Sequence, residues 1–278
     1  MDYTNELIDI AINEDIGDGD HTSLSCIPAD ARGKAQLLVK ENCIIAGVNL
    51  AKVIFNKIDR NLIFTQLIND GEAVSVGDIV FTIEGSSQTI LQAERLVLNF
   101  MQRMRGIASN TNRYVSLLDG LDTKVLDTRK TTPGLRTIEK LAVKIGGGEN
   151  HRIGLYDMIM IKDNHVDYAG GIEAAITSTK KYLSKNNKDL KIEVEARNLN
   201  ELNEILAVGG INRIMLDNFS FEDMRTAVKL IDNKYETEAS GGITFETLRE
   251  YAECGVDFIS VGALTHQINS IDLSLKAI

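Results

Sequence analysis

Between residues 124 and 263, short apolar runs alternate with amphipathic segments, and this alternation restricts the fold more than any other feature. Six runs have the length of buried strands, with helical patterns between them. Parallel strands need helical crossovers, so the region predicts a parallel α/β domain. The expected strands are Lys124–Thr128, Asp157–Lys162, Lys191–Ala196, Arg213–Asn218, Tyr235–Ser240 and Phe258–Ala263. The expected helices are Leu135–Ile145, Gly171–Ser184, Leu199–Val208, Phe221–Ile231 and Phe245–Cys254, with caps at Ser220, Thr244 and Gly255.

Nearly every expected strand ends at residues that can take part in chemistry or bind an anion. In a TIM-type barrel the carboxyl ends of all strands surround one mouth, whereas in an open sheet they spread along an edge. Because six such endings are best used when they converge, we expect an incomplete barrel of about six strands. The endings are Asp127-Thr128-Arg129-Lys130, Lys162-Asp163, Glu195, Asp217-Asn218, Ser240-Gly241-Gly242 and Val261-Gly262-Ala263.

The first third of the chain predicts a separate α/β domain. Its segment Asp70–Gly85 resembles the hairpins of lipoyl and biotinyl carrier domains, but it contains no lysine to modify, so only the fold is inferred. A long helix is expected over Gln88–Leu118. The other expected elements are strands at Lys34–Lys40, Ile44–Ala46 and Asn61–Leu67 and a helix at Gly47–Ile58.

Composition excludes several classes of protein. The net charge of -10 argues against general nucleic-acid binding. No window approaches the roughly 20 apolar residues of a membrane helix, and the acidic N-terminus is unlike a targeting peptide. The three cysteines form no CxxC pair, which fits a reducing cytoplasm and no zinc site.

One segment, residues 129–165, has seven Lys/Arg and two His against four acids, in an otherwise acidic chain. Such a local excess indicates a site for a small polyanion. Arginine binds carboxylates bidentately, and lysine acts as a point charge. The helical spacing of Arg136, Lys140 and Lys144 favours a solvated helix face, so these are left out of the site. The candidate cations are Arg129, Lys130, Arg152 and Lys162, with His151 beside them.

The last two strand endings, SGGIT and VGA, are typical of phosphate binding, with a helix starting near Thr244 to add its positive end. The alternative is that these glycines only make tight turns. Glu195 and Asp217 end neighbouring strands, where they can hold Mg²⁺, bind sugar hydroxyls, or act as acid and base. They can equally serve only to neutralise nearby cations.

Three further groups are weaker candidates. Gly146-Gly147-Gly148 lacks the GK[ST] of a Walker loop, and we interpret it as a flexible turn. Asp18, Asp20 and His21 lack further metal ligands, which favours a loop-ordering or interface role. His165 is expected to be a supporting partner of the site.

The chain resembles the quinolinate phosphoribosyltransferase family over nearly its whole length. Nine segments match in order: EDIGDGDHT, AERLVLNFMQRMRGIAS, DTRKTTPGLR, GGGENHRIGLYD, IKDNHV, IEVEARN, IMLDNF, ASGGIT and ISVGALTH. The resemblance implies an N-terminal α/β sandwich with lipoyl-like hairpins, an incomplete TIM-like α/β barrel and a homodimer with shared active sites, with hexamers left open. We place the sandwich at residues 1–105 and the barrel at 106–265, with a helix at 266–278 that packs back on the sandwich.

The implied reaction joins quinolinate to phosphoribosyl pyrophosphate and yields nicotinate mononucleotide, pyrophosphate and CO2, with Mg²⁺ brought by the donor and no organic cofactor. The implied catalytic residues are Lys130, Glu195 and Asp217, with Mg²⁺ near the two acids. The implied quinolinate-binding residues are Arg95 from the partner subunit, Arg129, Lys130, His151, Arg152 and Lys162. The implied donor-binding residues are Lys130, Glu195, Asp217, Ser240, Gly241, Gly242, Val261, Gly262, Ala263 and His266.

One departure from the family pattern is MRGIAS, in which Arg105 replaces a small polar residue; if it faces the site, it adds a cation. Two other hypotheses remain. A related molybdenum-transport protein is disfavoured by Lys162 in IKDNH. A non-catalytic carrier is disfavoured by the missing hairpin lysine and the complete set of cations.

Overall fold

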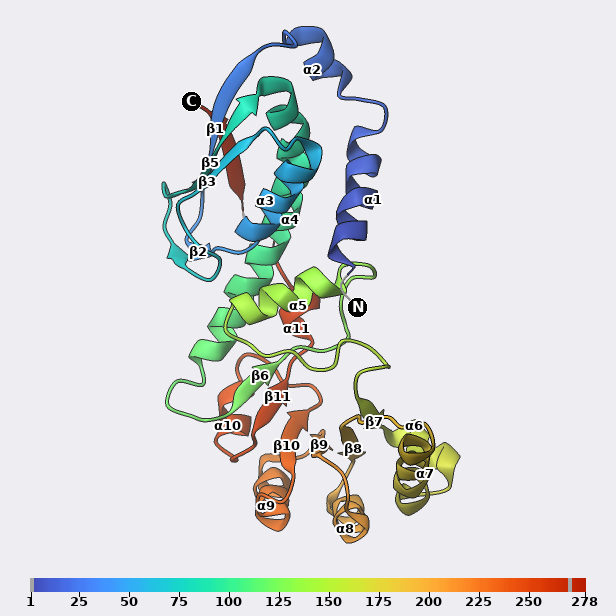
Figure 1. Cartoon of the computed structure of the whole chain (residues 1–278). Helices are drawn as coiled ribbons and strands as arrows, with labels where there is room; N and C mark the ends of the chain where they lie inside the picture. The colour runs from blue at the N-terminus through green and yellow to red at the C-terminus, as the bar shows by residue number, and fades with distance from the viewer. Residues whose placement is uncertain (1–2, 270–271) are drawn as a thin grey trace. The chain divides into compact units, whose positions relative to one another are not determined.

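The computed structural model describes residues 3–269 and 272–278, and the chain divides into two compact units (Figure 1). The sandwich unit contains the chain up to Arg113, Thr131–Gly148 and the chain from Leu264 onward; the barrel unit contains Tyr114–Lys130 and Glu149–Ala263. These limits differ from a simple division after residue 105, because helix α5 (Arg136–Ile145) packs with N-terminal elements. Among the described residues, no helix is both long and apolar enough to cross a membrane.

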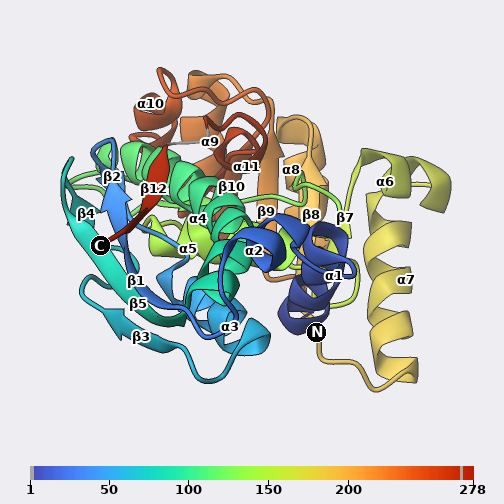
Figure 2. The same cartoon turned by 90° about the horizontal axis from the view of Figure 1, so that it is seen from above.

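The sandwich unit is built on a four-stranded antiparallel sheet in the order β12-β1-β5-β3. Helices α3 and α4 lie on one face of this sheet (Figure 2). Phe55 of α3 contacts the rings of Phe64 and Phe81 on the sheet, each with centroids 6.1 Å apart. The strands are β1 (Arg32–Val39), β3 (Ile63–Gln66), β5 (Ile79–Ser86) and β12 (Leu273–Ala277), with a separate pair β2 (Cys43–Ile44) and β4 (Ala73–Val74). Besides α5, the helices of this part of the chain are α1 (Thr4–Ile16), α2 (His21–Cys26), α3 (Val48–Ile58), α4 (Ser87–Ser116) and α11 (Ala263–His266).

The carboxyl-terminal segment is a strand, so the prediction of a helix at 266–278 is wrong. Strand β12 pairs with β1, with Leu275 opposite Leu37. Leu273 and Leu275 are buried and alternate with polar residues, which is the period of a strand rather than a helix.

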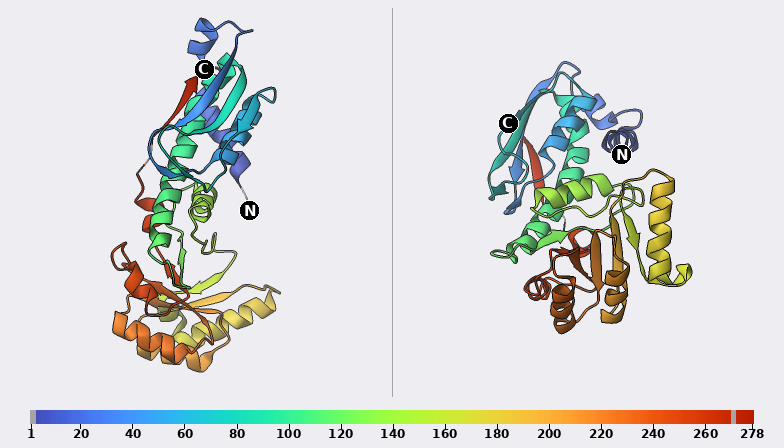
Figure 3. Two further views of the ribbon diagram at one scale, coloured as in Figure 1. Left: turned by 90° about the vertical axis from the view of Figure 1, so that its left-hand side faces the viewer. Right: turned by 60° about the horizontal axis from the view of Figure 1, so that its bottom comes forward.

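The barrel unit contains six parallel strands in the order β6-β11-β10-β9-β8-β7, which confirms the predicted incomplete barrel. Its edge strands, β6 and β7, are consecutive in the chain. Helices α8 and α9 lie along the outer side of the strands (Figure 3). The strands are β6 (Lys124–Leu126), β7 (Ile159–Ile161), β8 (Ile192–Ala196), β9 (Arg213–Asp217), β10 (Glu236–Ser240) and β11 (Phe258–Ser260). The helices are α6 (Asp163–Ala169), α7 (Ile172–Lys185), α8 (Leu199–Val208), α9 (Phe221–Ile231) and α10 (Leu248–Ala252).

Strand β8 shows how the barrel separates apolar and polar side chains. All five of its residues are buried. Because side chains alternate along a strand, Ile192, Val194 and Ala196 share one face, and Glu193 and Glu195 share the other. The acids therefore face the barrel interior.

Several local predictions need correction. Helix α10 begins at Leu248, not at Thr244, whose N–H instead donates to the Thr247 hydroxyl oxygen in a turn at 3.0 Å. Helix α6 is an additional element. Lys140 is 1% exposed, so it does not lie on a solvated face. The turn at 146–148 is tightly packed rather than flexible, since a Cβ on Gly146 would lie 2.3 Å from the Ala108 carbonyl oxygen.

Arg105 is a structural residue of the sandwich unit and not an extra cation of the active site. Its side chain is fully buried and donates to the carbonyl oxygens of Asp272 and Glu41, each at 2.9 Å. It therefore joins α4 to the segment before β12 and to the end of β1. Burial lowers the pKa of this guanidinium, and Cys43 and Glu41 oppose the shift.

We expect Arg105→Met to lower the free energy of unfolding by about 2–4 kcal/mol, because it removes the buried guanidinium that joins two carbonyl groups of distant segments. Urea denaturation measures this change. Arg113→Met, at an exposed position of the same helix, is the matched control and should change the free energy by about 0.5 kcal/mol or less. Equal effects of the two substitutions would contradict the structural role of Arg105.

Candidate active site

The barrel unit places most predicted site residues at the carboxyl ends of its strands. The ends of neighbouring strands lie close to the same level of the sheet. Ser240 of β10 pairs with Asp217 of β9, and Glu195 of β8 pairs with Met215, two residues before Asp217. His151 and Arg152 follow Glu149, which forms a parallel bridge with Leu126 at the end of β6. Arg95 and His266 are both exposed and belong to the sandwich unit. The residues at the strand ends are Arg129, Lys130, Lys162, Glu195, Asp217, Ser240, Gly241, Gly242, Val261, Gly262 and Ala263.

Lys162 and Glu195 form an ion pair across two neighbouring strands. The Lys162 Nζ atom lies 3.0 Å from Glu195 Oε2, and the carboxylate is 6% exposed. Helix α6 begins directly after Lys162, and His165 Nδ1 accepts a hydrogen bond of 3.0 Å from the Lys162 N–H. His165 thus supports the site by fixing the backbone of Lys162, as expected from the sequence.

Asp127 was predicted from the sequence to lie at a strand end, but no role was assigned to it. It is fully buried, and its Oδ1 accepts from the His151 N–H at 2.8 Å. Its other oxygen accepts from the Asn150 side-chain amide at 2.6 Å. A carboxylate with two donors from the next loop fixes the start of that loop. Asp127 therefore sets the position from which His151 and Arg152 extend.

Arg152 and Arg129 bring two positive charges close together. Burial and the charge of Arg129 lower the pKa of the Arg152 guanidinium, while Glu193 and Asp157 oppose this shift. Arg152 Nη1 also donates to the Met158 carbonyl at 3.2 Å. Arg152 is partly buried and Arg129 is exposed, and an anion bound near two guanidiniums that repel each other would lower the energy.

Two further buried carboxylates, Glu193 and Glu238, were missed from the sequence. His151 Nε2 lies 3.0 Å from Glu193 Oε2 and 3.2 Å from Glu238 Oε2, and both acids are fully buried. Arg213 Nη1 contacts the same Glu238 oxygen at 3.1 Å. The signal was present in the sequence, because each acid lies two residues before a predicted site residue and so faces the same side of its strand.

The carboxylates shift one another's protonation. Burial raises the pKa of Glu193 to about 7; Glu238 adds to the rise, and His151 and Arg213 oppose it. Burial also acts to raise the pKa of Glu238, but His151, Ser260 and Arg213 together hold it below its usual range. Glu238 is therefore the more firmly ionised member of the pair.

The SGG ending is shaped for a close backbone approach. Gly241 has φ +93°, and a Cβ there would lie 2.3 Å from Asn218 Oδ1. Asn218 in turn donates to Asp217 Oδ2 at 2.6 Å. The five-residue helix α10 starts at Leu248, too late to bring its positive end to this loop. The Val261 N–H is already bonded to the Leu126 carbonyl at 2.9 Å.

Metal-binding side chains gather in one place among the residues that the structure describes. His151, Glu193 and Glu238 have ligand atoms within 4.8 Å of one another, whereas Glu195 and Asp217 belong to no such group of three. Near the N-terminus, Asp20 caps α2 by accepting from the N–H groups of Thr22 and Ser23, each at 3.1 Å. Asp20 therefore has the loop-ordering role that the sequence favoured.

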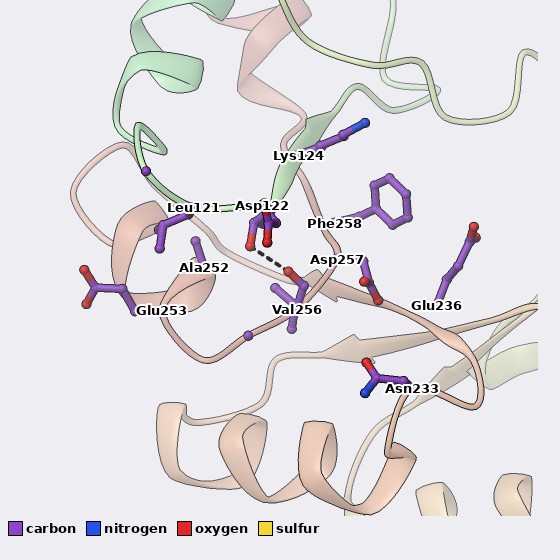
Figure 4. A pocket seen from close by; sticks show the side chains of 13 residues that line it. Leu121, Asp122, Lys124, Asn233, Glu236, Ala252, Glu253, Val256, Asp257 and Phe258 are labelled. Carbon is purple, nitrogen blue, oxygen red and sulfur yellow. Dashed lines mark hydrogen bonds between the residues drawn. The ribbon is translucent and has the colours of Figure 1, made fainter.

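A cavity of about 570 Å³ lies at the opposite ends of the strands (Figure 4). Its lining includes Lys124, Glu236 and Phe258, the first residues of β6, β10 and β11. It contains none of the predicted site residues. In TIM-type barrels the chemistry takes place at the carboxyl ends, so this cavity is not the candidate active site.

Comparison with known proteins agrees with this geometry. Residues 20–105 match the sequence model of the quinolinate phosphoribosyl transferase N-terminal domain, and residues 107–276 match that of the C-terminal domain. The chain belongs to the quinolinate phosphoribosyl transferase family.

Relatives match the chain over nearly its whole length. Quinolinate phosphoribosyltransferase (decarboxylating) 1b of Nicotiana tabacum is 44% identical over 285 residues, which cover 97% of this chain and 81% of the relative. The probable nicotinate-nucleotide pyrophosphorylase (carboxylating) of Bacillus subtilis is 42% identical over 262 residues, or 94% of this chain and 89% of the relative.

Solved structures of the quinolinate phosphoribosyl transferase family share the fold. NadC from Streptococcus pyogenes superimposes with a TM-score of 0.93 at 37% identity, covering 98% of this chain and 95% of that one. The nicotinate-nucleotide pyrophosphorylase from Francisella tularensis gives 0.92 at 42% identity, covering 99% and 96%.

The His151 contacts predict a loss of stability at alkaline pH. Burial lowers the pKa of His151, but Glu193 and Glu238 outweigh it and raise the pKa to about 9. The Arg152 N–H, 2.6 Å from Nδ1, favours the neutral ring; we expect the two carboxylates to dominate, because they are full charges and the N–H is a dipole. A folded pKa above the unfolded value stabilises the protein below the unfolded pKa of about 6.5, and this contribution is lost as the pH rises through 9.

The wild type should therefore lose about 2 kcal/mol of unfolding free energy between pH 7 and pH 10 that His151→Gln does not lose. Urea denaturation of both proteins across this range measures the difference. Parallel curves for the two proteins would mean that His151 is neutral at pH 7.

Proposed function

We propose that this chain transfers the phosphoribosyl group of phosphoribosyl pyrophosphate to quinolinate with decarboxylation. The products are nicotinate mononucleotide, pyrophosphate and CO2, as a step of NAD biosynthesis. The observation that supports this most is the arrangement at one barrel end, where Arg129, Arg152 and Lys162 share the carboxyl ends of the strands with Glu195 and Asp217, and Lys162 pairs with Glu195. Cations suit a dicarboxylate, and the acids suit a sugar that becomes positively charged.

Quinolinate has two carboxylates beside a ring nitrogen. Arg129 and Arg152, whose charges repel in the free chain, gain a counter-charge when a dianion binds between them. Lys162, already fixed by Glu195 and by the start of α6, offers a single point charge, and Lys130 and His151 complete the set. Holding both carboxylates aims the ring nitrogen at the sugar carbon, which removes much of the entropic cost of the reaction.

The donor sugar meets Glu195 and Asp217. When the bond to pyrophosphate breaks, the sugar carbon becomes oxocarbenium-like, and the two carboxylates stabilise this charge. The sugar phosphate is assigned to the loop N–H groups and side chains around Ser240, Gly241, Gly242, Gly262 and Ala263. After the nitrogen is ribosylated, the positively charged ring stabilises the carbanion left when the adjacent carboxylate departs as CO2, so the substrate itself is the electron sink.

Magnesium is proposed to arrive with the donor. Among the described residues Glu195 and Asp217 lack a third metal-binding neighbour, and two carboxylates suit the partial coordination that Mg²⁺ prefers beside phosphates. The bound ion would offset the charge of the leaving pyrophosphate. The three cysteines are free, which suits a reducing compartment such as the cytoplasm.

We expect nicotinate, which lacks the second carboxylate, to be a poor substrate. The contacts that Arg129, Arg152 and Lys162 are proposed to make with the second carboxylate would then be lost, and a site built to bind a polar group strongly rejects a ligand that lacks it. The kcat/KM for nicotinate should be lower than that for quinolinate by about a hundredfold or more. Comparable values for the two compounds would refute the proposed function.

A second proposal is a homodimer whose active sites are shared, with Arg95 of one subunit completing the barrel site of the other. Arg95 is an exposed cation on α4 and outside the barrel unit, which is consistent with a partner role. Arg95→Ala and Lys162→Ala should each be nearly inactive as homodimers. Mixed after reversible dissociation, they should regain about a quarter of wild-type sites, since half the dimers are mixed and one of two sites is intact.

Subunit exchange must be verified in that experiment, for example by native mass spectrometry of a size-tagged variant. The Arg113→Met variant mixed with Lys162→Ala is the control for mixed dimers, and it should keep about half of the wild-type sites whether or not the subunits exchange. If exchange occurs and mixing restores no activity, Arg95 acts within its own chain.

A further inference from the structure

We propose that Glu193 and Glu238 are positioning residues that hold His151, and through it Arg152, in place one layer of side chains below the quinolinate site. The inference rests on the proposed function, because its main readout is the affinity for quinolinate. Neither acid is at the end of a strand, so neither is placed to touch the substrates. They act on the reaction through the residues that they hold.

Two sets of contacts hold His151, one on its backbone and one on its ring, and together they are called the anchor. The backbone of His151 is fixed by its N–H, which donates to Asp127 Oδ1 at 2.8 Å. The ring Nε2 forms ion-pair contacts with Glu193 and Glu238, at 3.0 and 3.2 Å, although neither contact has the geometry of a hydrogen bond. Arg152 is the next residue, so its starting point depends on both parts. Glu193 also acts directly on Arg152, whose charge it stabilises against the repulsion of Arg129.

The cost of this cluster indicates a function beyond stability. Both oxygens of Glu193 and one oxygen of Glu238 have no hydrogen-bond donor of good geometry among the described residues. Burying charged groups without full hydrogen bonding is expensive, and apolar side chains of similar size often stabilise a fold equally well. Ionisable groups at these positions are explained when their charge is needed to hold the cations of the site.

The neighbouring strands complete the charge balance. On β9, Arg213 donates to Glu238 through Nη1 and to Glu236 through Nε and Nη2. On β11, Ser260 lowers the pKa of Glu238, and the Phe258 ring lies 4.0 Å from the Arg213 guanidinium carbon. Arg213 disfavours a metal ion between His151, Glu193 and Glu238, since a divalent cation would lie next to a fixed guanidinium.

The test compares Glu238→Gln with Glu236→Gln. Both substitutions remove one negative charge from the same face of β10, and both remove a partner of Arg213. Only Glu238 contacts His151, so the pair separates the anchor from a general effect on the strand. Glu238→Gln should raise the KM for quinolinate about tenfold with a much smaller change in the KM for phosphoribosyl pyrophosphate. Glu236→Gln should stay close to the wild type in both constants.

A spectroscopic readout does not depend on turnover. The chain has four histidines, so selective ¹⁵N-histidine labelling gives a simple ring spectrum in which His151→Gln identifies the His151 signals. Those signals should move in Glu238→Gln and stay in place in Glu236→Gln. Metal analysis of the purified wild type should find no stoichiometric transition metal.

The outcomes are distinct. If Glu238→Gln shifts the His151 signals and leaves the quinolinate KM unchanged, the cluster is only structural and the inference is wrong. Equal effects of the two glutamine variants, or a bound metal lost in Glu238→Gln, would also overturn it. If the wild type does not turn over quinolinate at all, the proposed function fails, while the histidine spectrum still reports on the anchor.

Discussion

The contact between Glu238 and His151 links the inside of the barrel to its mouth. One carboxylate oxygen of Glu238 is shared by His151 and Arg213, and Glu193 approaches the same imidazole from the neighbouring face. Inside a protein such charges interact strongly, and an unpaired one is costly. Glu193 and Glu238 therefore supply negative charge that offsets the positive charge of the cations near the open end of the barrel.

The same principle applies one layer higher. Lys162 is paired with Glu195 in the free chain, at 3.0 Å, while Arg129 and Arg152 repel each other. A dianionic substrate would relieve this repulsion, and the acids would then face the sugar. In the proposed function, binding and chemistry are connected through charge balance, since the groups proposed to hold the pyridine ring lie at the same barrel end as those proposed to stabilise the sugar cation.

The sequence predicted the barrel because period-2 runs and helical patterns alternate clearly along residues 124–263, and each strand except β11 ends within two residues of its prediction. The strand ends also located Lys162, Glu195 and Asp217 correctly at one edge. Glu193 and Glu238 were missed because only the strand ends were considered. An acid inside a strand is recognised as facing the site only when the alternation of side chains is traced back from the strand end. Asp127 was noted, yet its role depends on a loop 23 residues away in the chain.

Other features depended on contacts that a local pattern does not contain. Arg105 was undecided from the sequence, since only tertiary structure reveals that two distant carbonyl groups meet its guanidinium. The last strand was mistaken for a helix, although Leu273 and Leu275 already alternate with polar residues. Thr244 resembles a helix cap, but the following turn delays the start of α10 to Leu248, so the proposed phosphate site does not lie at the start of α10.

The central claim is that charge balance at the barrel mouth serves the joining of quinolinate to phosphoribosyl pyrophosphate. The most direct measurement incubates the purified chain with both compounds and Mg²⁺, with quinolinate labelled with ¹³C in the carboxylate next to the ring nitrogen. The account predicts equal amounts of nicotinate mononucleotide, pyrophosphate and ¹³CO2, with no product when either substrate is left out. Absence of nicotinate mononucleotide from folded wild-type protein, or a product that keeps the label, would contradict it.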